Sequence, residues 1–473
     1  MHVARIYDVL VVGAGATGAS AACLAAKRGR KTALLEQGPE LLPLLRGFER
    51  AGAHFDTGFT YAGALGPGET LRKMLEAVGL SGLEFIPVRE EGYDRFDFED
   101  SHFSYEFVTG KERLTGQLKR LFPAESAALD RFFEKMLSVK TVSFDGPLRF
   151  ESLLERDTPY SLQDVLDELF TDPRLKAVLS LSSFLHGTPP SKISFSKHAN
   201  FLGEMYQSVC RVKGGGLALA RAFEACLSAR GVDTFTSARV VRVEPEPDGN
   251  KRVTLADGRS FLCRDCVCTV QPPQFLNLTP EKVYPRAIRG MIAQIPNTYG
   301  VFTVHCKMHG VREERYCNRY YLPSLDIEKC FDLTERPVFL AVNFSDGDPQ
   351  TVNLMVPYRA DNPRVRRDAP DYETRKQRLA QAIMGALKDV NPHLAAHLTV
   401  EAVSTPATLA RYTLSDGGIY GRMHDMAHSW VLSPVTKIPG LYLAGQSVTG
   451  PGLRGAVTSA LVINSIINDI HGK

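Results

Sequence analysis

The sequence predicts an α/β fold in which a discontinuous domain with a parallel sheet is joined to an α+β domain with a second sheet and a helical insert. Residues 7–36 are typical of a strand, a glycine turn, a helix and a second strand in succession. The segment 440–466 repeats the order of strand, glycine turn and helix at the far end of the chain. The 473 residues, 44% of them hydrophobic, are enough for large buried cores, and a formal net charge of +3 argues against binding nucleic acid through bulk charge.

Each predicted element rests on its own pattern of residues. Apolar positions at helical spacing predict helices at 16–29, 68–80, 111–140, 161–187, 214–231 and 372–390. Pro123 breaks the third of these, and Asp172-Pro173 divides the fourth into two helices. Runs of β-branched and apolar residues predict strands at 7–12, 31–36, 238–244, 252–256, 297–308 and 336–344, of which the last two belong to a second sheet.

A glycine motif lies between the first strand and its helix. Gly13, Gly15 and Gly18 form GxGxxG, in which the first glycine permits a tight turn, the second the approach of a pyrophosphate and the third close packing of helix on sheet. The helix N-terminus offers N–H groups to phosphates. Glu36 ends the second strand, where a carboxylate accepts hydrogen bonds from an adenosine ribose. Together these features predict a dinucleotide site, with a glycine turn made only for packing as the alternative.

The far end of the chain decides between FAD and NAD, since Glu36 suits both. GLYLAGQSVTGPGLRG at 440–455 is a second glycine turn that leads into a second helix. It offers a further place for ribityl or phosphate oxygens, which a simple NAD dehydrogenase does not need. No cysteine is flanked to suggest covalent flavin attachment, so the predicted cofactor is non-covalent FAD.

Five blocks of sequence carry a family resemblance. They are the glycine motif with its helix and second strand (11–36), GFERAGAHFDTGFTY (47–61), the stretch from HGTPP through the glycine triplet (186–225), STPATLARYTLSDGGIYG (404–421) and GLYLAGQ (440–446). In these blocks the chain resembles the superfamily of FAD-dependent phytoene desaturases, carotenoid isomerases and retinol saturases, which is related to the flavin amine oxidases. The first block is shared by many flavoproteins. The middle three are most similar to the isomerase and saturase side of the polyene-acting branch.

The resemblance implies both a domain division and a set of site residues. Residues 1–65, 205–285 and 405–473 would form a Rossmann-like FAD-binding domain, and 66–204 and 286–404 a substrate-binding domain. Position by position, the pyrophosphate would meet Gly13, Gly15, Ala16, Thr17 and Gly18. Glu36, with Gln37 beside it, would meet the adenosine ribose, and Val240 the adenine. The ribityl chain and flavin ring would meet Gly445, Gln446, Gly452 and Leu453.

Two departures from the family pattern concern this site. Relatives usually have a glycine pair shortly after the ribose acid, where this chain has Pro43, Leu44, Leu45 and Arg46, and Arg46 is predicted to reach a phosphate. Many relatives have an acid after the glycine of the last turn, where this chain has Gln446. A glutamine both donates and accepts hydrogen bonds, and saturase-like relatives have similar turns.

No strong acid–base pair stands out in the sequence. Hydride exchange with a conjugated chain leaves charge that the polyene itself delocalises, so such a pair is optional. Tyr420, in the fourth block, is the catalytic candidate because the block lies near the expected flavin, and a packing role is the alternative. His186, His198 and Tyr206 lie in the third block, and each is read as a structural residue with catalysis as the alternative.

Three further motifs do not require a cofactor in addition to FAD. Cys263, Cys266 and Cys268 form CxxCxC in a stretch that alternates as a strand, so they are read as buried thiols and no metal site is predicted. The triplet 214–216 has no clear strand before it and no acid at the right distance after it, which argues against a dedicated NAD(P) loop. Arg364, Arg366 and Arg367 are read as a solvated face, with a membrane-surface contact as the alternative.

The functional prediction is an FAD-dependent oxidoreductase acting on a polyene or polyunsaturated lipid by desaturation, saturation or cis–trans isomerisation. A flavin amine oxidase is one alternative, although Trp430 is the only tryptophan for an aromatic cage. A non-catalytic FAD-binding carrier or assembly protein is another. The expected partner is an apolar small molecule, with no nucleic acid and an electron donor or acceptor of unknown kind. The predicted location is cytoplasmic, with peripheral contact at the inner membrane surface left open.

Overall fold

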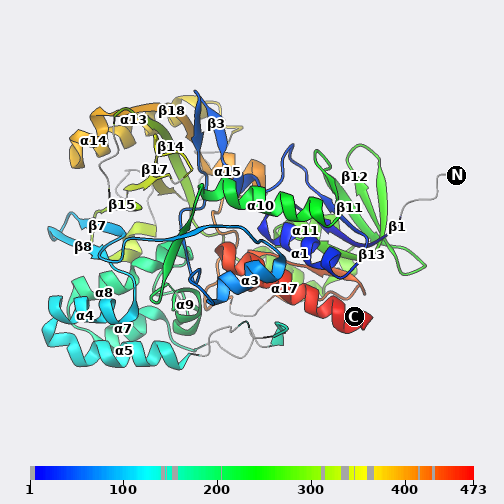
Figure 1. Cartoon of the computed structure of the whole chain (residues 1–473), viewed down its shortest axis with the longest axis horizontal. Helices are drawn as coiled ribbons and strands as arrows, with labels where there is room; N and C mark the ends of the chain where they lie inside the picture. The colour runs from blue at the N-terminus through cyan, green and yellow to red at the C-terminus, as the bar shows by residue number, and fades with distance from the viewer. Residues whose placement is uncertain are drawn as a thin grey trace.

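Two seven-stranded sheets dominate the described part of the chain, one at each side of Figure 1. The computed structural model describes residues 6–139, 144, 146–151, 158–203, 205–310, 315–331, 340–345, 347–358, 367–413, 416–428 and 432–472. Trp430, Arg364 and Arg366, which the sequence analysis singled out, lie outside these ranges. Each sheet takes its strands from widely separated segments of the chain. Helices and strands alternate along much of the sequence, so the fold is mixed α/β, as predicted.

The first sheet has the strand order β10-β2-β1-β13-β12-β11, and β19 pairs with β13. Its strands are β1 (Ile6–Val12), β2 (Thr32–Leu35), β10 (Asp233–Phe235), β11 (Val240–Pro245), β12 (Lys251–Leu255), β13 (Ser260–Cys268) and β19 (Leu441–Leu443). β1 runs parallel to both β2 and β13, and β13 runs parallel to β19. The carboxyl ends of these strands therefore meet at one edge, although the chain visits them more than 400 residues apart.

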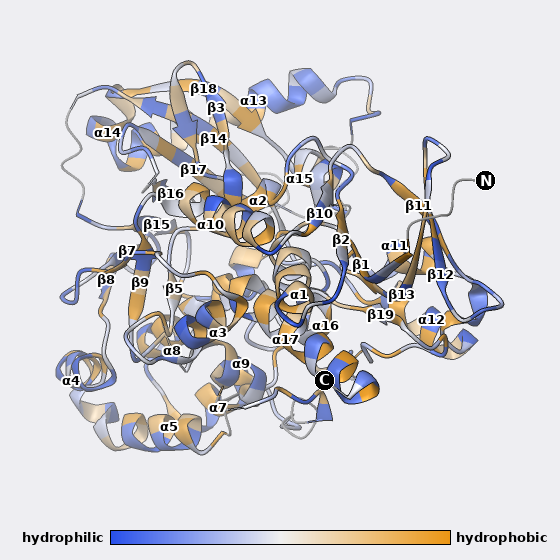
Figure 2. Ribbon diagram, turned by 45° about the vertical axis from the view of Figure 1, so that its right-hand side comes forward, coloured by the Kyte–Doolittle hydropathy of each residue, from blue (hydrophilic) through white to orange (hydrophobic). Residues whose placement is uncertain are grey.

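Helices cover both faces of this sheet, and they are α1 (Ala16–Lys27), α2 (Pro43–Arg46), α3 (Thr70–Val78), α10 (Gly215–Ala229), α11 (Pro272–Leu278), η3 (Glu281–Val283), α12 (Arg286–Gln294), α16 (Gln446–Thr449) and α17 (Gly452–His471). Val9 and Val11 face the core beneath α1, α3, α10 and α17, whereas Leu10 and Val12 face the core beneath α11 and α12. Figure 2 shows α1 and α17 against each other, and small residues such as Ala22 and Ala460 allow this close packing.

The second sheet has the order β18-β14-β17-β16-β15-β7-β8. Its strands are β7 (Asp94–Phe98), β8 (Phe103–Phe107), β14 (Gly300–Met308), β15 (Asn318–Leu322), β16 (Leu340–Phe344), β17 (Thr351–Tyr358) and β18 (Leu398–Ser404). Its accompanying helices are η4 (Ile327–Phe331), α13 (Tyr372–Val390), α14 (Pro392–Ala396) and α15 (Pro406–Thr413). Neighbouring strands are antiparallel except β15 and β7, which are parallel.

A row of buried polar side chains crosses this second sheet. The residues that follow one another in strand register are Asp94, Asn318, Asn343, Asn353 and His305. Each of these side chains forms a hydrogen bond with the next residue of the row or with the segment 56–61 that lies over it. For example, the distance from Asn343 Nδ2 to Asn318 Oδ1 is 2.7 Å, and that from His305 Nδ1 to Asn353 Oδ1 is also 2.7 Å. The row satisfies polar groups that would otherwise be costly to bury.

The block 47–61 lies along this row. Asn353 Nδ2 donates to the Asp56 carbonyl, Asn343 Nδ2 to Thr60 Oγ1, and the Tyr61 hydroxyl to Asp94 Oδ2 at 2.5 Å. Its first part forms a hairpin of β3 (Phe48–Arg50) and β4 (Ala53–Phe55). This segment is thus fixed to the second sheet by a line of side-chain hydrogen bonds.

The helical insert packs beneath β7 and β8. Its helices are α4 (Lys111–Leu121), η1 (Pro123–Glu125), α5 (Ser126–Ser138), α7 (Leu162–Leu169), α8 (Pro173–Ser180), η2 (Leu181–Leu185) and α9 (Phe195–Leu202). Figure 2 shows α5 with one hydrophobic and one hydrophilic face. The buried face carries Phe132 and Phe133, which join the same core as Phe96 and Phe107 of the second sheet. Pro123 and Pro173 each open a helix, which confirms the predicted breaks.

One expectation about the middle of the chain is wrong. The glycine triplet was expected to have no clear strand before it, yet β9 (Val209–Val212) is separated from the start of α10 by only two residues. β9 pairs with β5 (Ala62–Gly63) and β6 (Phe85–Pro87) in a separate three-stranded sheet. The final helix also begins earlier than expected, at Gly452 and not near Gly455. The domain boundaries themselves remain a prediction.

Among the described residues, no helix combines the length and the apolar composition that crossing a membrane requires.

Candidate functional site

Two glycine turns meet at the carboxyl edge of the first sheet. The first follows β1 and leads into α1, and the second follows β19 and leads into α17. β13 lies between β1 and β19, so the turns are held on either side of its end. Both helices begin without a side-chain cap and without an acidic residue in the first turn. Their first N–H groups are therefore suited to an anionic or polar ligand at the crevice outside the strands.

Each of the three positions of the first turn suits glycine for a different structural reason. Gly13 has φ +97°, a conformation that favours glycine. A Cβ on Gly18 would lie 1.8 Å from the Gly13 carbonyl oxygen, so this position tolerates no side chain. A Cβ on Gly15 would meet nothing within 4 Å, and its φ of −72° is ordinary. Neither packing nor backbone conformation requires glycine at 15, which leaves space for a ligand close to the chain.

Replacement of Gly18 by alanine is therefore expected to destabilise the fold. The added methyl group must displace the Gly13 carbonyl or separate α1 from β1, at a cost of about 1–3 kcal/mol or more. Urea unfolding measures the loss. Gly385→Ala is the control, because a Cβ there meets nothing within 4 Å and alanine favours the interior of α13. Equal stability of the two variants would contradict the packing argument.

Glu36 lies directly beside the first turn and is 6% exposed. Its Oε2 accepts from the Ala14 N–H and its Oε1 from the Gly38 N–H, each at 2.8 Å. A carboxylate has about four acceptor positions, so these bonds fix its orientation and leave capacity for ribose hydroxyls. Its backbone carbonyl accepts from the Ala238 N–H, which places the start of β11, with the predicted adenine neighbour Val240, close to it.

The second turn repeats the glycine spacing of the first. Gly450, Gly452 and Gly455 also form GxGxxG, a repetition that the sequence analysis missed. A Cβ on Gly455 would lie 1.7 Å from the Gly450 carbonyl oxygen, whereas one on Gly452 would meet nothing within 4 Å. Space for a ligand thus lies beside both Gly15 and Gly452, although Gly452, with φ +73°, also has a backbone conformation that favours glycine. The two turns fit a cofactor with polar groups at both ends.

Gln446 and Gly445 are held by the second turn itself. Gln446 Oε1 accepts from the Gly452 N–H at 3.2 Å, and the Gly445 N–H donates to Ser459 Oγ of α17. The side-chain amide of Gln446 therefore orders the turn. Leu453 is partly buried and packs against the core beneath α1 and α17.

Thr269 is a site residue that the sequence analysis did not identify. It follows β13, and its hydroxyl donates toward the carbonyls of Val12 and Gly13. Its own carbonyl oxygen lies 3.9 Å from the position of a Gly445 Cβ. Thr269 thus spaces the two turns. Its position directly after a buried parallel strand was the available signal.

Arg46 is only partly where the phosphate prediction requires it. α2 lies beside the first turn, because the Leu42 N–H donates to the Ala14 carbonyl. However, the guanidinium of Arg46 forms an ion pair with Glu224 of α10 and donates to the Leu41 carbonyl. Gln37 is partly buried next to Glu36. The structure therefore gathers the predicted nucleotide residues at one edge, with Arg46 already engaged by protein groups.

Tyr420 lies between the second turn and Tyr299, which directly precedes strand β14 of the second sheet. Its ring contacts Gly187, where an added Cβ would lie 2.8 Å from Cδ2, and it meets Tyr299 edge to face at 6.4 Å. The next residue, Gly421, adjoins Ser447 of α16. Burial raises the pKa of Tyr420 to about 12, so its hydroxyl stays protonated at neutral pH.

His186 and His198 form a buried pair, with Nε2 of the first 3.3 Å from Nδ1 of the second. Burial lowers the pKa of His198 to about 3 and that of His186 well below its ordinary value, so both rings are neutral. His424 Nε2 lies 2.9 Å from the Gln446 carbonyl, and Phe201 lies between His424 and His186. The neutral His186–His198 pair and the ring of His424 thus lie close to the second turn.

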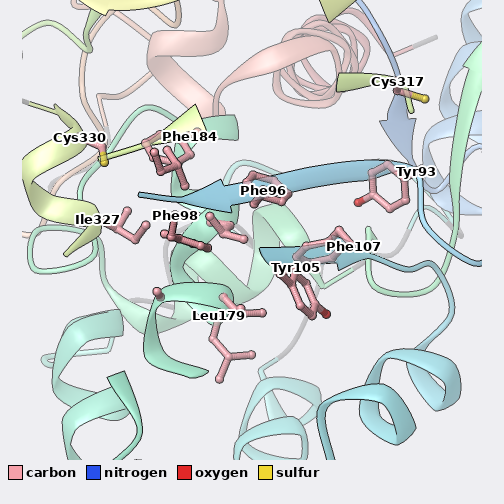
Figure 3. Close-up of a cluster of buried hydrophobic side chains, with 14 of the residues drawn as sticks. Tyr93, Phe96, Phe98, Tyr105, Phe107, Leu179, Phe184, Cys317, Ile327 and Cys330 are labelled. Carbon is pink, nitrogen blue, oxygen red and sulfur yellow. The ribbon is translucent and has the colours of Figure 1, made fainter. Parts of the chain in front are cut away.

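An aromatic cavity lies between β7, β15 and η2. Figure 3 shows buried side chains of this region, among them several aromatic rings. The cavity is small, with about 20 Å³ of room for water-sized molecules, and its walls include Tyr93, Phe96, Phe107 and Phe184. Asp94 is 2% exposed at this cavity, and burial raises its pKa to about 7. The cavity was not predicted from the sequence. Asp94 shares one strand face with Phe96 and Phe98, and a carboxylate in such an aromatic row was a usable signal.

The cysteines of CxxCxC lie on β13. Cys263, Cys266 and Cys268 are all buried, consistent with their reading as core thiols. The glycine triplet is explained by packing, because a Cβ on Gly216 would lie 2.3 Å from the Leu45 carbonyl oxygen and one on Gly215 close to Asp56.

Comparison with known proteins places these features in a family context. Residues 17–462 match the family described as flavin containing amine oxidoreductase. The all-trans-retinol 13,14-reductase of Rattus norvegicus is 26% identical, with 97% of this chain and 85% of that protein covered. The enzyme of the same name from Homo sapiens is also 26% identical, with the same coverage. Among solved structures, putrescine oxidase bound to putrescine has a TM-score of 0.68 at 17% identity, covering 99% of this chain and 100% of that one, which shows a shared fold.

Proposed function

The chain belongs to the flavin-containing amine oxidoreductase family, and on this premise we propose that it is an FAD-dependent oxidoreductase acting on a polyene lipid of retinoid or carotenoid type. The observation that carries the proposal is the similarity to all-trans-retinol 13,14-reductases over 97% of the chain. Their name favours saturation of a carbon–carbon double bond over desaturation or cis–trans isomerisation. The family implies FAD as the cofactor, and the open positions at Gly15 and Gly452 fit it.

Bound FAD would supply hydride exchange with a carbon of the substrate. The two glycine turns would bind its polar ends, with Glu36 on the ribose and the N–H groups of α1 on the pyrophosphate. Tyr420 would hold a proton at its hydroxyl near the substrate, since its pKa of about 12 keeps it protonated.

Anaerobic titration of the photoreduced protein tests this function. The purified protein is expected to contain FAD, and all-trans-retinol or a carotenoid is expected to reoxidise the flavin and yield a product two hydrogens richer, identified by mass spectrometry. Conversion to a geometric isomer without net flavin oxidation would instead support isomerisation. A protein that cannot be loaded with FAD, or whose reduced flavin reacts with none of these polyenes, would contradict the proposal.

A flavin amine oxidase is the second candidate, favoured by the fold shared with putrescine oxidase and by the acidic residue Asp94 in an aromatic cavity. This function predicts that putrescine or another amine reduces the oxidised flavin anaerobically, whereas the polyene reductase predicts no such reduction. A chain that binds FAD but reacts with neither class would be a non-catalytic flavoprotein.

A further inference from the structure

The thiols of Cys23 and Cys226 meet between two helices of the first sheet. Cys23 lies on α1 and Cys226 on α10, and these helices pack against each other in one hydrophobic core. The Cys23 thiol donates a hydrogen bond to the sulfur of Cys226. Cys226 Sγ also lies 3.6 Å from the carbonyl oxygen of Val78, the last residue of α3. Two cysteines that are far apart in the sequence are thus neighbours where three helices converge.

Two cationic side chains are fixed beside this pair. The backbone N–H of Arg230 donates to the Cys226 carbonyl, one helical turn before it. Nη1 of Arg230 donates to the carbonyls of Cys23 and Val78, each at 2.6 Å. Lys27 follows Cys23 by one turn of α1, and its Nζ donates at 2.9 Å to a carbonyl oxygen of α3. Cations held next to a sulfur atom stabilise the thiolate relative to the thiol.

The two thiols differ in acidity and in exposure. The hydrogen bond from Cys23 lowers the pKa of Cys226 to about 7, assisted by the two cations and opposed by burial. The same hydrogen bond raises the pKa of Cys23, which keeps its proton. Cys226 is 7% exposed, whereas Cys23 is fully buried. Cys226 is therefore the thiolate that a small oxidant reaches, and Cys23 is the thiol that lies ready beside it.

We propose that Cys226 and Cys23 form a peroxide-reactive pair that closes reversibly into a disulfide between α10 and α1. The Cys226 thiolate attacks one oxygen of hydrogen peroxide and the O–O bond breaks, which gives a sulfenic acid and a hydroxide that takes up a proton. The Cys23 thiol then attacks the sulfenic sulfur, and its proton leaves with the displaced hydroxide as water while the S–S bond forms. In total the two thiols lose two electrons and two protons, and the peroxide becomes two molecules of water. The inference does not depend on the substrate of the proposed function.

A second pair of neighbouring cysteines, Cys266 and Cys268, provides an internal control. Their sulfur atoms lie 4.0 Å apart, and both side chains are fully buried. They are two residues apart on the single strand β13, so their Cα atoms are separated by about 6.5 Å, close to the upper limit of about 6.8 Å for a disulfide. Closing this pair would distort a central strand, whereas Cys23 and Cys226 lie on separate helices that can adjust. Proximity of sulfur atoms alone therefore does not predict oxidation of Cys266 and Cys268.

Peptide mapping of the full-length, FAD-loaded protein tests the inference. The protein is reduced, freed of reductant, treated with hydrogen peroxide, unfolded in an alkylating reagent and digested for mass spectrometry. The expected product is a pair of peptides linked through Cys23 and Cys226, two hydrogens lighter than the separate reduced peptides. Dithiothreitol is expected to separate them again. The other cysteines, with Cys266 and Cys268 among them, are expected to be recovered in alkylated form.

Serine variants assign the two roles. In Cys23→Ser, Cys226 is expected to stop at the sulfenic acid, which dimedone traps, whereas wild type gives little adduct because Cys23 displaces the hydroxyl group. In Cys226→Ser, Cys23 is expected to remain a thiol. Cys268→Ser is the matched control, since it removes a buried thiol of the same sheet and is expected to leave the link between Cys23 and Cys226 unchanged.

Migration on a denaturing gel without reductant gives a second readout on wild type itself. The disulfide would enclose residues 23–226 in a loop, so the oxidised chain is expected to migrate faster than the reduced one. Recovery of both thiols in alkylated form after peroxide treatment would overturn the inference. Oxidation of Cys226 to a sulfinic acid without a link to Cys23 would also overturn it, as would a link between Cys266 and Cys268 that forms equally fast.

Discussion

Replacement of Gly15 by valine is expected to leave the protein folded and to remove its FAD. A Cβ at this position meets no atom within 4 Å outside its chain neighbours, and φ is −72°, so the β-carbon of valine fits the fold. The side chain would occupy the space beside the first turn of α1. Loss of the backbone contacts to a pyrophosphate removes more than one charge-assisted hydrogen bond of about 1.5–3 kcal/mol, so affinity should fall on the order of 100-fold or more.

The flavin-to-protein absorbance ratio after reconstitution measures this loss, and circular dichroism checks the fold. Gly290→Val is the matched control, because a Cβ there also meets nothing within 4 Å but lies in α12, on the opposite face of the first sheet. Melting temperatures are compared without FAD, since bound cofactor would itself stabilise wild type. Full FAD content in Gly15→Val would show that the first turn does not hold the pyrophosphate.

Substitution of Asp94 by asparagine is expected to remove a large pH dependence of stability. Burial raises the pKa of Asp94 from 3.8 to about 7, although hydrogen bonds from Tyr61 and Asn318 act against the rise. The native state therefore holds this proton more strongly than the unfolded chain. The stabilisation is complete below pH 3.8 and is lost as pH rises to about 7, by on the order of 4 kcal/mol in total.

The difference in unfolding free energy between Asp94→Asn and wild type isolates this group. Between pH 5 and pH 8 the wild type is expected to lose about 3 kcal/mol of unfolding free energy relative to the variant, as measured by urea unfolding. The neighbouring hydroxyls of Tyr61, Tyr93 and Tyr320 have pKa values raised by burial, so they remain neutral over this range.

Asp97 on the same strand is the control, and its effect has the opposite sign. Burial opposes its ionisation, but hydrogen bonds from Arg95 and Ser104 hold its pKa below the ordinary value. Its stabilisation is present at neutral pH and is lost on acidification, so Asp97→Asn should not gain stability between pH 5 and pH 8. Parallel pH profiles of Asp94→Asn and wild type would refute the assignment to Asp94.

Local pattern was sufficient to predict the first glycine turn and the elements around it. GxGxxG followed by a helix and a strand ending in Glu36 is a contiguous unit, so spacing alone predicted β1, α1 and β2 and the acid beside the turn. The helix at 372–390 was predicted at both ends because its charged and apolar residues alternate at helical spacing. In these segments the interactions that form the element are close in sequence.

Only the tertiary structure shows which distant segments of the chain come together. Thr269 spaces the two turns because β13 lies between β1 and β19, a strand order that no local pattern encodes. Strand β9 is stabilised by pairing with residues 62–63 and 85–87, which overrides its weak local signal. The cavity likewise combines Tyr61, Asp94, Ser182, Tyr206 and Tyr320 from five separate segments. Burial and hydrogen-bond satisfaction depend on which segments meet in space. Contacts between segments that are distant in the sequence are therefore visible only in the folded structure.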